Sequence, residues 1–335
     1  MNKPKQECRK LMLCVTACIM LVLASGWGKA LAQEAVVYRL KWLINMSTVG
    51  DVYAQVQGFF DQAGLRVTIK PGGPERDAIR ELELGYADFG VASADQVIRA
   101  LAKGAPVVVL AQLFQVNPLQ WIYRRDRLDL HNLSALRGKT IGVTFGKNDE
   151  FIMRTLLSAA HIDSSQVRLF SVRLDYTPFY KGEVDLWPVY INTQGVEIGA
   201  RMRQAGESIA FFNPVEYGVR FVSNSVVTSQ RMLAQQPETV RRFIKALLRG
   251  WRQAIDPANT ADALAAVRHY DKDTAMKILE AQMESTRPLI QPNPRVVVGA
   301  IDRQAWQQTE EIMLAHQQID HPVHVLRYLK PLATH

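Results

Sequence analysis

Cysteine is confined to the first 18 residues of this 335-residue chain, at Cys8, Cys14 and Cys18. We expect that segment to be removed from the mature protein, for the reasons given below. The mature chain then has no cysteine, and therefore neither a disulfide nor thiol chemistry.

The common catalytic motifs are also missing. The chain contains no G-x-S-x-G, H-E-x-x-H, C-x-x-C or P-loop sequence and no complete G-x-G-x-x-G. Most of the seven histidines lie in the C-terminal third, and the close pair His321 and His324 falls in a proline-containing tail. The carboxylates form no metal-like cluster. These absences favour a binding protein over an enzyme, with no cofactor and no metal.

Long hydrophobic runs are scarce. The run at residues 11–23 is short for a membrane span, which needs about 20 residues. Basic residues precede it, and Ala30-Leu31-Ala32 follows as a small-x-small cleavage site, so residues 1–32 read as a signal peptide. An uncleaved N-terminal anchor is the alternative. A lipid anchor at Cys18 is disfavoured, because the apolar run continues beyond it. We expect a periplasmic or otherwise extracytoplasmic protein.

The positive charge is partly a property of that N-terminal segment. Residues 1–32 carry five basic groups and one acidic group, so the formal net charge falls from +8 to +4 on cleavage. No basic stripe is interleaved with aromatics, and we expect no nucleic-acid partner.

The most informative stretch is residues 41–91. A strand at 36–43, a polar loop at 45–48, a helix, a strand at 65–69, a helix at about 74–84 and a third strand form a βαβαβ pattern. Ligands of open parallel sheets bind at the carboxyl ends of the strands, which points to the 45–48 loop and Ser93. Ser93 or Asp95 could equally be a plain N-cap of the next helix.

A second βαβαβ pattern occupies residues 138–190. The two units share a G-x-x-D sequence before their third strand, Gly85 to Asp88 and Gly182 to Asp185. This weak repeat predicts two similar lobes facing each other.

Aromatic and polar residues gather at the predicted strand ends. Stacked aromatics suit a flat heterocycle, and carboxylates at 149 and 150 would accept hydrogen bonds from its amino groups. The alternatives are core packing for each aromatic and helix-dipole complementation for Asp149 and Glu150. The candidate ligand-binding residues are Trp42, Asn45, Ser47, Thr48, Ser93, Phe114, Gln115, Asn148, Asp149, Glu150, Tyr176, Trp187 and Tyr190. We expect Trp187→Ala to abolish binding and leave the stability of the ligand-free protein nearly unchanged.

Several segments together resemble the type II solute-binding proteins of ABC importers, in the branch that binds aliphatic sulfonates, nitrate and thiamine-pyrimidine precursors. The most specific is the element Gly58-Phe59-Phe60-x-x-x-Gly64-Leu65. The others include Lys41-Trp42, Leu84-Gly85-x-x-Asp88-Phe89-Gly90, Leu136-x-Gly138-Lys139-x-Ile141-Gly142-Val143 and Tyr217-Gly218-Val219.

This resemblance implies an α/β fold of two Rossmann-like lobes with mostly parallel sheets, joined by two crossover strands. Lobe one would comprise residues 33–119 and 224–335, and lobe two residues 120–223. The ligand would lie in the cleft, and closure would present the complex to a membrane permease. We expect a monomer.

We favour a thiamine pyrimidine precursor, or a related flat heterocycle such as a flavin, as the ligand. One alternative is a sulfonate- or nitrate-type anion carrier, in which Lys41, Lys147 and Arg173 would supply charge. The other is an exported enzyme or a sensor domain. The related synthases depend on a cysteine-rich motif, which the mature chain lacks.

Overall fold

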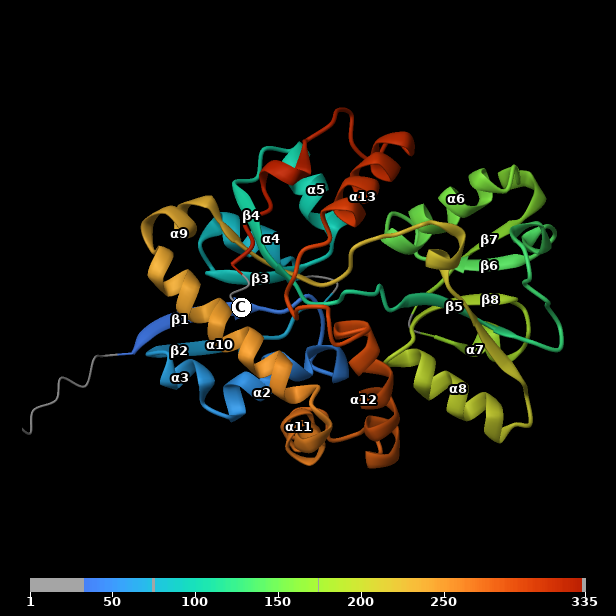
Figure 1. The fold of residues 1–335 in the computed structure, drawn as a ribbon. Coiled ribbons are helices and arrows are strands. Elements are labelled where there is room, and N and C mark those ends of the chain that lie inside the picture. Colours follow the sequence, from blue (N-terminus) through green and yellow to red (C-terminus); the bar gives the residue numbers. More distant parts are fainter. Residues whose placement is uncertain (1–32, 74–75, 174, 333–335) are drawn as a thin grey trace, which may run out of the picture. The chain divides into compact units, whose positions relative to one another are not determined.

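The computed structural model describes residues 33–73, 76–173 and 175–332. The predicted signal peptide and Cys18 lie outside these ranges. The first of two five-stranded sheets has the strand order β2-β1-β3-β10-β4. Figure 1 labels its strands β1, β2, β3 and β4. Its strands are β1 (Glu34–Arg39), β2 (Leu65–Lys70), β3 (Phe89–Ala92), β4 (Val107–Gln112) and β10 (Ser225–Ser229).

The second sheet has the order β7-β6-β8-β5-β9. Its strands are β5 (Leu119–Arg124), β6 (Thr140–Val143), β7 (Arg168–Ser171), β8 (Leu186–Tyr190) and β9 (Ile209–Phe212). The chain passes from the first sheet to the second between β4 and β5, and returns between β9 and β10. These two crossings and the α/β class confirm the predicted fold.

Both sheets are mixed, which refines the expectation of mostly parallel sheets. β1 pairs with β3, and β6 pairs with β7 and β8, in parallel. The strands that follow each crossing run the other way: β10 is antiparallel to β3 and β4, and β5 is antiparallel to β8 and β9. A strand that enters a sheet directly from the other sheet has no preceding crossover helix to orient it in parallel.

The shared G-x-x-D sequence has the same structural role in both sheets. Gly85 and Gly182 adopt left-handed backbone angles, with φ of 72° and 77°, and each follows a helix. Three residues later, Asp88 accepts a hydrogen bond from the Val37 N–H, and Asp185 accepts one from the Thr140 N–H, both at 2.8 Å. Each aspartate therefore ties the start of its own strand to the parallel neighbour, and the predicted repeat is confirmed.

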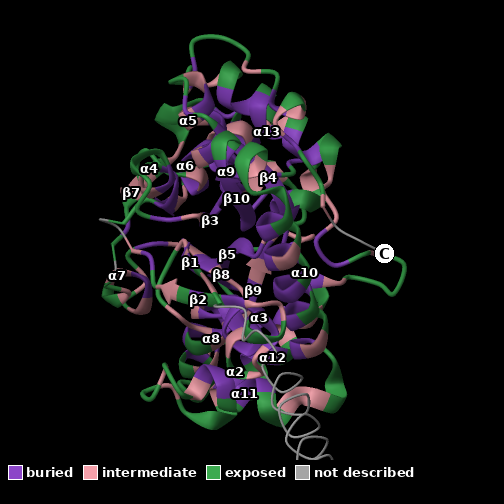
Figure 2. Ribbon diagram, turned by 90° about the vertical axis from the view of Figure 1, so that its left-hand side faces the viewer, coloured by how far each residue is buried: buried purple, intermediate pink, exposed green. Residues whose placement is uncertain are grey.

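Helices cover the faces of both sheets, and Figure 2 shows buried residues concentrated along the strands and the helix faces on them. The helices are α2 (Val49–Val56), α3 (Phe59–Gln62), α4 (Ala78–Leu84), α5 (Ala94–Ala102), α6 (Asn148–Ala159), α7 (Thr177–Tyr180), α8 (Gln194–Gln204), α9 (Gln230–Gln235), α10 (Pro237–Ala254), α11 (Thr260–Arg268), α12 (Met276–Ile290) and α13 (Arg303–Ala315). Short 3-10 turns are η1 (Met46–Thr48), η2 (Leu133–Leu136), η3 (Ser164–Gln166), η4 (Pro214–Tyr217), η5 (Pro257–Asn259) and η6 (Val325–Arg327).

An apolar stripe along α10 is buried in the first core. Its Phe243 stacks on Phe89 of β3 and on Phe60 of α3, with ring centroids 3.8 and 5.4 Å apart. This aromatic cluster fixes α10 against the first sheet, because buried aromatic pairs add about 0.5–1.5 kcal/mol each beyond their area.

Two predicted elements differ at their ends. The single helix expected between the loop at 45–48 and the strand at 65–69 is broken at Gly58, whose φ of 67° lies outside the helical region, and Val56 is exposed. The first strand ends at Arg39 and not at residue 43. Within the described ranges, no helix has the length and apolar character to cross a bilayer. The lobe boundaries at residues 119–120 and 223–224 stay a prediction.

Candidate ligand-binding site

A cavity of about 1130 Å³ is lined by residues from the strand ends of both sheets. The structure brings ten of the thirteen predicted residues to its wall: Trp42, Asn45, Ser47, Thr48, Ser93, Asn148, Asp149, Tyr176, Trp187 and Tyr190. The rule that ligands bind at the carboxyl ends of strands accounts for this agreement. Whether these residues bind a ligand stays a prediction.

Phe114, Gln115 and Glu150 are not among the lining residues. Phe114 is buried in the first core and meets Trp251 edge to face, with centroids 6.1 Å apart. The Gln115 amide donates to the backbone oxygens of Gln112 and Ala300. The expectation that these side chains face the cavity is wrong, because packing and backbone partners already occupy them.

The first wall follows β1. Gly72 packs against the backbone that follows β1. A Cβ at position 72 would lie only 2.2 Å from the Leu40 carbonyl oxygen. The Gly72 N–H donates to the Trp42 carbonyl at 2.9 Å, which fixes the backbone that carries the Lys41 and Trp42 side chains. Asn45 then caps η1 by accepting from the Ser47 N–H at 2.8 Å. Trp42 remains 36% exposed, so its ring is available to a ligand.

Ser93 is the N-cap of α5, as the simpler of the two interpretations predicts. It forms a capping box with Gln96, and its hydroxyl donates to Asp95 at 2.6 Å. Arg99 pairs with the same carboxylate at 3.2 Å. Ser93 therefore already has partners within its own helix.

The second wall includes the start of α6. Asp149 accepts from the Thr144 N–H at 2.6 Å, and Glu150 accepts from the Gly146 N–H at 2.7 Å. Both carboxylates therefore hold the loop that precedes their own helix. Burial raises the pKa of Asp149 to about 6, although the Thr144 hydrogen bond opposes the rise. Asn148 offers a buried side-chain nitrogen with no hydrogen-bond partner among the described residues.

Trp187 lines the cavity but is only 1% exposed. Its ring meets Tyr176 edge to face at 5.9 Å and lies within 6.4 Å of the Phe170 and Phe179 centroids. It therefore belongs to the core beneath the second sheet. Because the ring is packed into this core, the expectation that Trp187→Ala leaves the stability of the ligand-free protein nearly unchanged is wrong.

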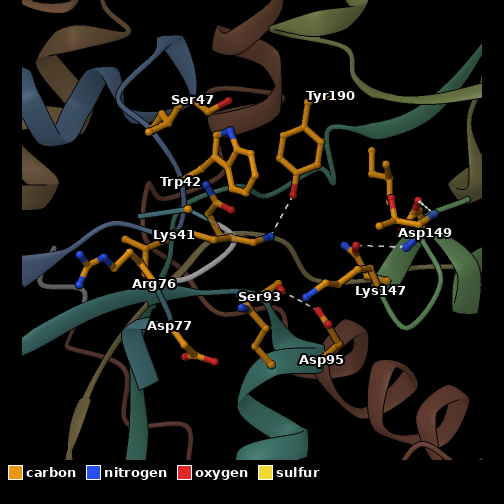
Figure 3. A pocket seen from close by; sticks show the side chains of 18 of the residues that line it. Lys41, Trp42, Ser47, Arg76, Asp77, Ser93, Asp95, Lys147, Asp149 and Tyr190 are labelled. Carbon is orange, nitrogen blue, oxygen red and sulfur yellow. Dashed lines mark hydrogen bonds between the residues drawn. The ribbon is translucent and has the colours of Figure 1, made fainter. Parts of the chain in front are cut away.

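Lys41 joins the two walls. Its ammonium donates to the Tyr190 hydroxyl at 3.1 Å, as Figure 3 shows. Burial lowers the pKa of Lys41, but its interactions with Tyr190, Asp95 and Asp149 outweigh burial, and the pKa is raised. Sequence reasoning named Lys41 only for an anion carrier. The only indication of this role in the sequence was the position of Lys41, a single lysine at the end of a buried strand.

Asp51 of α2 is a second residue that sequence reasoning missed. It lines the cavity and is 1% exposed, and it accepts from the Tyr38 hydroxyl at 2.7 Å. Burial raises its pKa to about 7, although hydrogen bonds from Tyr38 and Trp251 lower it. In the sequence Asp51 is an acidic residue in the first turn of a helix, a common pattern that does not indicate burial.

The geometry thus combines aromatic rings, hydrogen-bonding groups and charges around one cavity. Among the described residues, no group of three or more His, Cys, Asp and Glu side chains could hold a metal ion. An arrangement of this kind can enclose a small polar molecule with a flat ring.

Comparison with known proteins places the chain among relatives of two kinds. A formylaminopyrimidine-binding protein of Halalkalibacterium halodurans is 27% identical over 298 residues, 87% of this chain and 88% of that protein. The riboflavin-binding protein RibY of Chloroflexus aurantiacus is 24% identical over 310 residues, 87% of this chain and 84% of that protein. A 4-amino-5-hydroxymethyl-2-methylpyrimidine phosphate synthase of Legionella pneumophila is 27% identical over 224 residues, 65% of this chain and 68% of that protein.

Among solved structures, the periplasmic aliphatic sulphonate binding protein SsuA of Escherichia coli superposes with a TM-score of 0.70 at 13% identity, covering 88% of this chain and 92% of that one. That likeness is one of fold. The family model described as NMT1/THI5 like matches residues 45–261, well over half of the chain. The chain therefore belongs to the NMT1/THI5-like family and has the fold of periplasmic solute-binding proteins.

Proposed function

We propose that this protein is the substrate-binding component of an ABC importer and captures a small flat heterocycle. A thiamine pyrimidine precursor is the favoured ligand, and a related ring such as a flavin is the next. The relatives named for formylaminopyrimidine and riboflavin binding support this choice of ligand class. We further propose that the protein acts outside the cytoplasm as a monomer and delivers its ligand to a membrane permease.

One observation carries the proposal: aromatic rings from both sheets line the same cavity. Trp42 follows β1, and Tyr190 ends β8, and Figure 3 shows the two rings on the same side of Lys41. Flat heterocycles stack on such rings, and hydrogen-bonding groups at the edge of the ring give specificity. Asp149 also lines this cavity, and we infer that its carboxylate accepts from a ring amino group.

A binding role is favoured over the synthase activity of the more distant relatives. The family resemblance implies that this synthase branch depends on a cysteine-rich motif, and this sequence has no cysteine after residue 18. Turnover of any cavity ligand by the purified protein would contradict the binding role.

A thermal-shift screen with aminopyrimidines, riboflavin and alkanesulfonates tests the ligand class. A ligand at a hundredfold excess over its dissociation constant adds about 2.7 kcal/mol to the free energy of unfolding, which gives a clear rise in melting temperature. We expect that rise with a heterocycle. A rise with sulfonates alone would instead support the anion carrier, whose charge would come from the basic residues of the cavity wall.

A further inference from the structure

The charged residues that line the cavity fall into two groups. Every acidic one has a partner inside the protein. Those contacts are Asp51 with the Tyr38 hydroxyl, Asp77 with the Ile79 N–H, Glu83 with Arg80, Asp95 with Ser93 and Arg99, and Asp149 with the Thr144 N–H. Glu83 and Asp95 are therefore paired with arginines, and the other three carboxylates accept hydrogen bonds from within the protein.

Several basic side chains of the same wall have no such partner. Arg76, Lys103, Lys147 and Arg173 line the cavity, and none makes a hydrogen bond or ion pair with another described residue through its side chain. Surface charges of this kind are ordinary when they point into open solvent. These four residues are exposed, but they also line a cavity, where an excess of one sign of charge raises the local potential for an anion.

Two of these cations come from adjacent strand ends. β6 and β7 pair in parallel with Val143 opposite Ser171, and Lys147 and Arg173 follow those two residues closely along the chain. In Figure 3 the Lys147 side chain extends toward Ser93. The buried, unpartnered Asn148 nitrogen lies next to Lys147 in sequence and in the same wall. An ammonium, a guanidinium and an amide donor therefore come from neighbouring segments of the same cavity wall.

The volume of the cavity also exceeds the need of a single ring. At about 1130 Å³ it lies slightly above the size range of small-molecule sites, which is about 300–1,000 Å³. A pyrimidine placed against Trp42 and Tyr190 would fill only part of this volume.

We propose that the ligand is a flat heterocycle with a phosphate-type anionic arm, and that Lys147, Arg173 and the Asn148 amide hold that arm. The inference rests on the proposed function, since it adds a second subsite to the same cavity. Glu150 pairs with Arg154, and the Asp149 and Glu150 carboxylates are both turned onto the preceding loop, where they accept from the Thr144 and Gly146 N–H groups. The remaining charge of Asp149 counts against an anion, and the basic side chains of this wall must outweigh it.

Isothermal titration with pairs of ligands that differ only in a phosphate group tests the proposed anionic arm. Suitable pairs are riboflavin with flavin mononucleotide, and 4-amino-5-hydroxymethyl-2-methylpyrimidine with its phosphate, with inorganic phosphate as a third probe. We expect the phosphorylated form of the ring that binds to be favoured about tenfold or more in low salt, as charge-assisted hydrogen bonds require. The preference should shrink as salt rises.

The double variant Lys147→Gln/Arg173→Gln should remove this preference and leave the affinity for the unphosphorylated ring nearly unchanged. Lys245→Gln is the matched control, since Lys245 is exposed on α10 and does not line the cavity. It should keep the preference. Melting temperatures near that of the wild type would establish that both variants fold.

The outcomes separate the two proposals. Equal affinity for both members of a pair, or a preference that survives in the double variant, would overturn the anionic arm and leave the heterocycle site standing. Binding of inorganic phosphate with no gain from an attached ring would also overturn it. If no ring binds in either form, the proposed function itself fails, and the arm fails with it.

Discussion

The two sheets share a scaffold and differ in what they place at its edge. In both, the three strands of the βαβαβ unit have the order second, first, third, and the antiparallel strand that follows a crossing comes next. In both, a left-handed glycine and an aspartate three residues later tie the third strand to the first. The residues that follow the first strand of each unit and line the cavity differ. Lys41 and the partly exposed Trp42 follow β1, whereas Thr144 and the buried Asp149 follow β6.

The difference shows that the repeat in the sequence concerns the scaffold and not the chemistry. The G-x-x-D residues must satisfy one backbone geometry twice, so they recur. Under the proposed function the cavity residues would contact one ligand from two sides, so they have no reason to recur.

The largest expected effect contrasts the two tryptophans. Trp187→Ala should cost the ligand-free protein about 3–5 kcal/mol of unfolding free energy, because it empties a buried aromatic site in the second core. Trp42→Ala should cost no more than about 1 kcal/mol, because that ring is partly exposed. Urea denaturation of both variants measures the contrast. Similar losses would mean that the two walls do not differ as described.

The next effect concerns pH and the two buried carboxylates, one in each wall. The folded-state pKa values of Asp51 and Asp149 are raised to about 7 and about 6, so the folded protein favours their protonated forms. Their contribution to stability is therefore full below pH about 4 and is lost as pH rises toward 6 and 7.

Asp51→Asn should remove the larger part of this pH-dependent loss of stability, which is on the order of a few kcal/mol at most. The variant should still fold, since its amide oxygen can accept from the Tyr38 hydroxyl. Melting temperatures at pH 5 and pH 8 report the loss. We expect a smaller fall between the two pH values in the variant than in the wild type. The same fall in both proteins would show that Asp51 does not titrate in this window.

A smaller effect tests the shared scaffold directly. Asp88→Ala and Asp185→Ala each leave a strand N–H without its acceptor, and each should cost about 1–3 kcal/mol. Asp126→Ala, at an exposed position, is the control and should change stability by about 0.5 kcal/mol or less. Chemical denaturation measures all three. A large loss for one aspartate and none for the other would break the equivalence of the two sheets.

Much of this architecture could be predicted from the sequence, because local rules govern it. The Gly85 and Gly182 turns need a left-handed backbone, and the period of the apolar residues marks the strands and α10. The position of the cavity follows from the placement of loops at strand ends.

The details of the site could not be predicted, because they depend on contacts between distant residues. Lys41 meets Tyr190, which lies 149 residues away in the chain. An aromatic at a strand end can face a ligand or a core, and only the packing of Phe179 and Tyr176 against Trp187 decides between them. Likewise, the turn of Asp149 back onto the Thr144 N–H depends on a loop geometry that no periodic pattern encodes.

The central claim is that one ligand is held from both walls at once. Isothermal titration of the heterocycle that binds, carried out on the wild type, Trp42→Ala and Tyr190→Ala, tests it most directly. We expect a single site and a loss of affinity of about tenfold or more in each variant, as the removal of a stacked ring from a binding site predicts. Unchanged affinity in either variant would mean that the ligand touches one wall only, and would contradict the account.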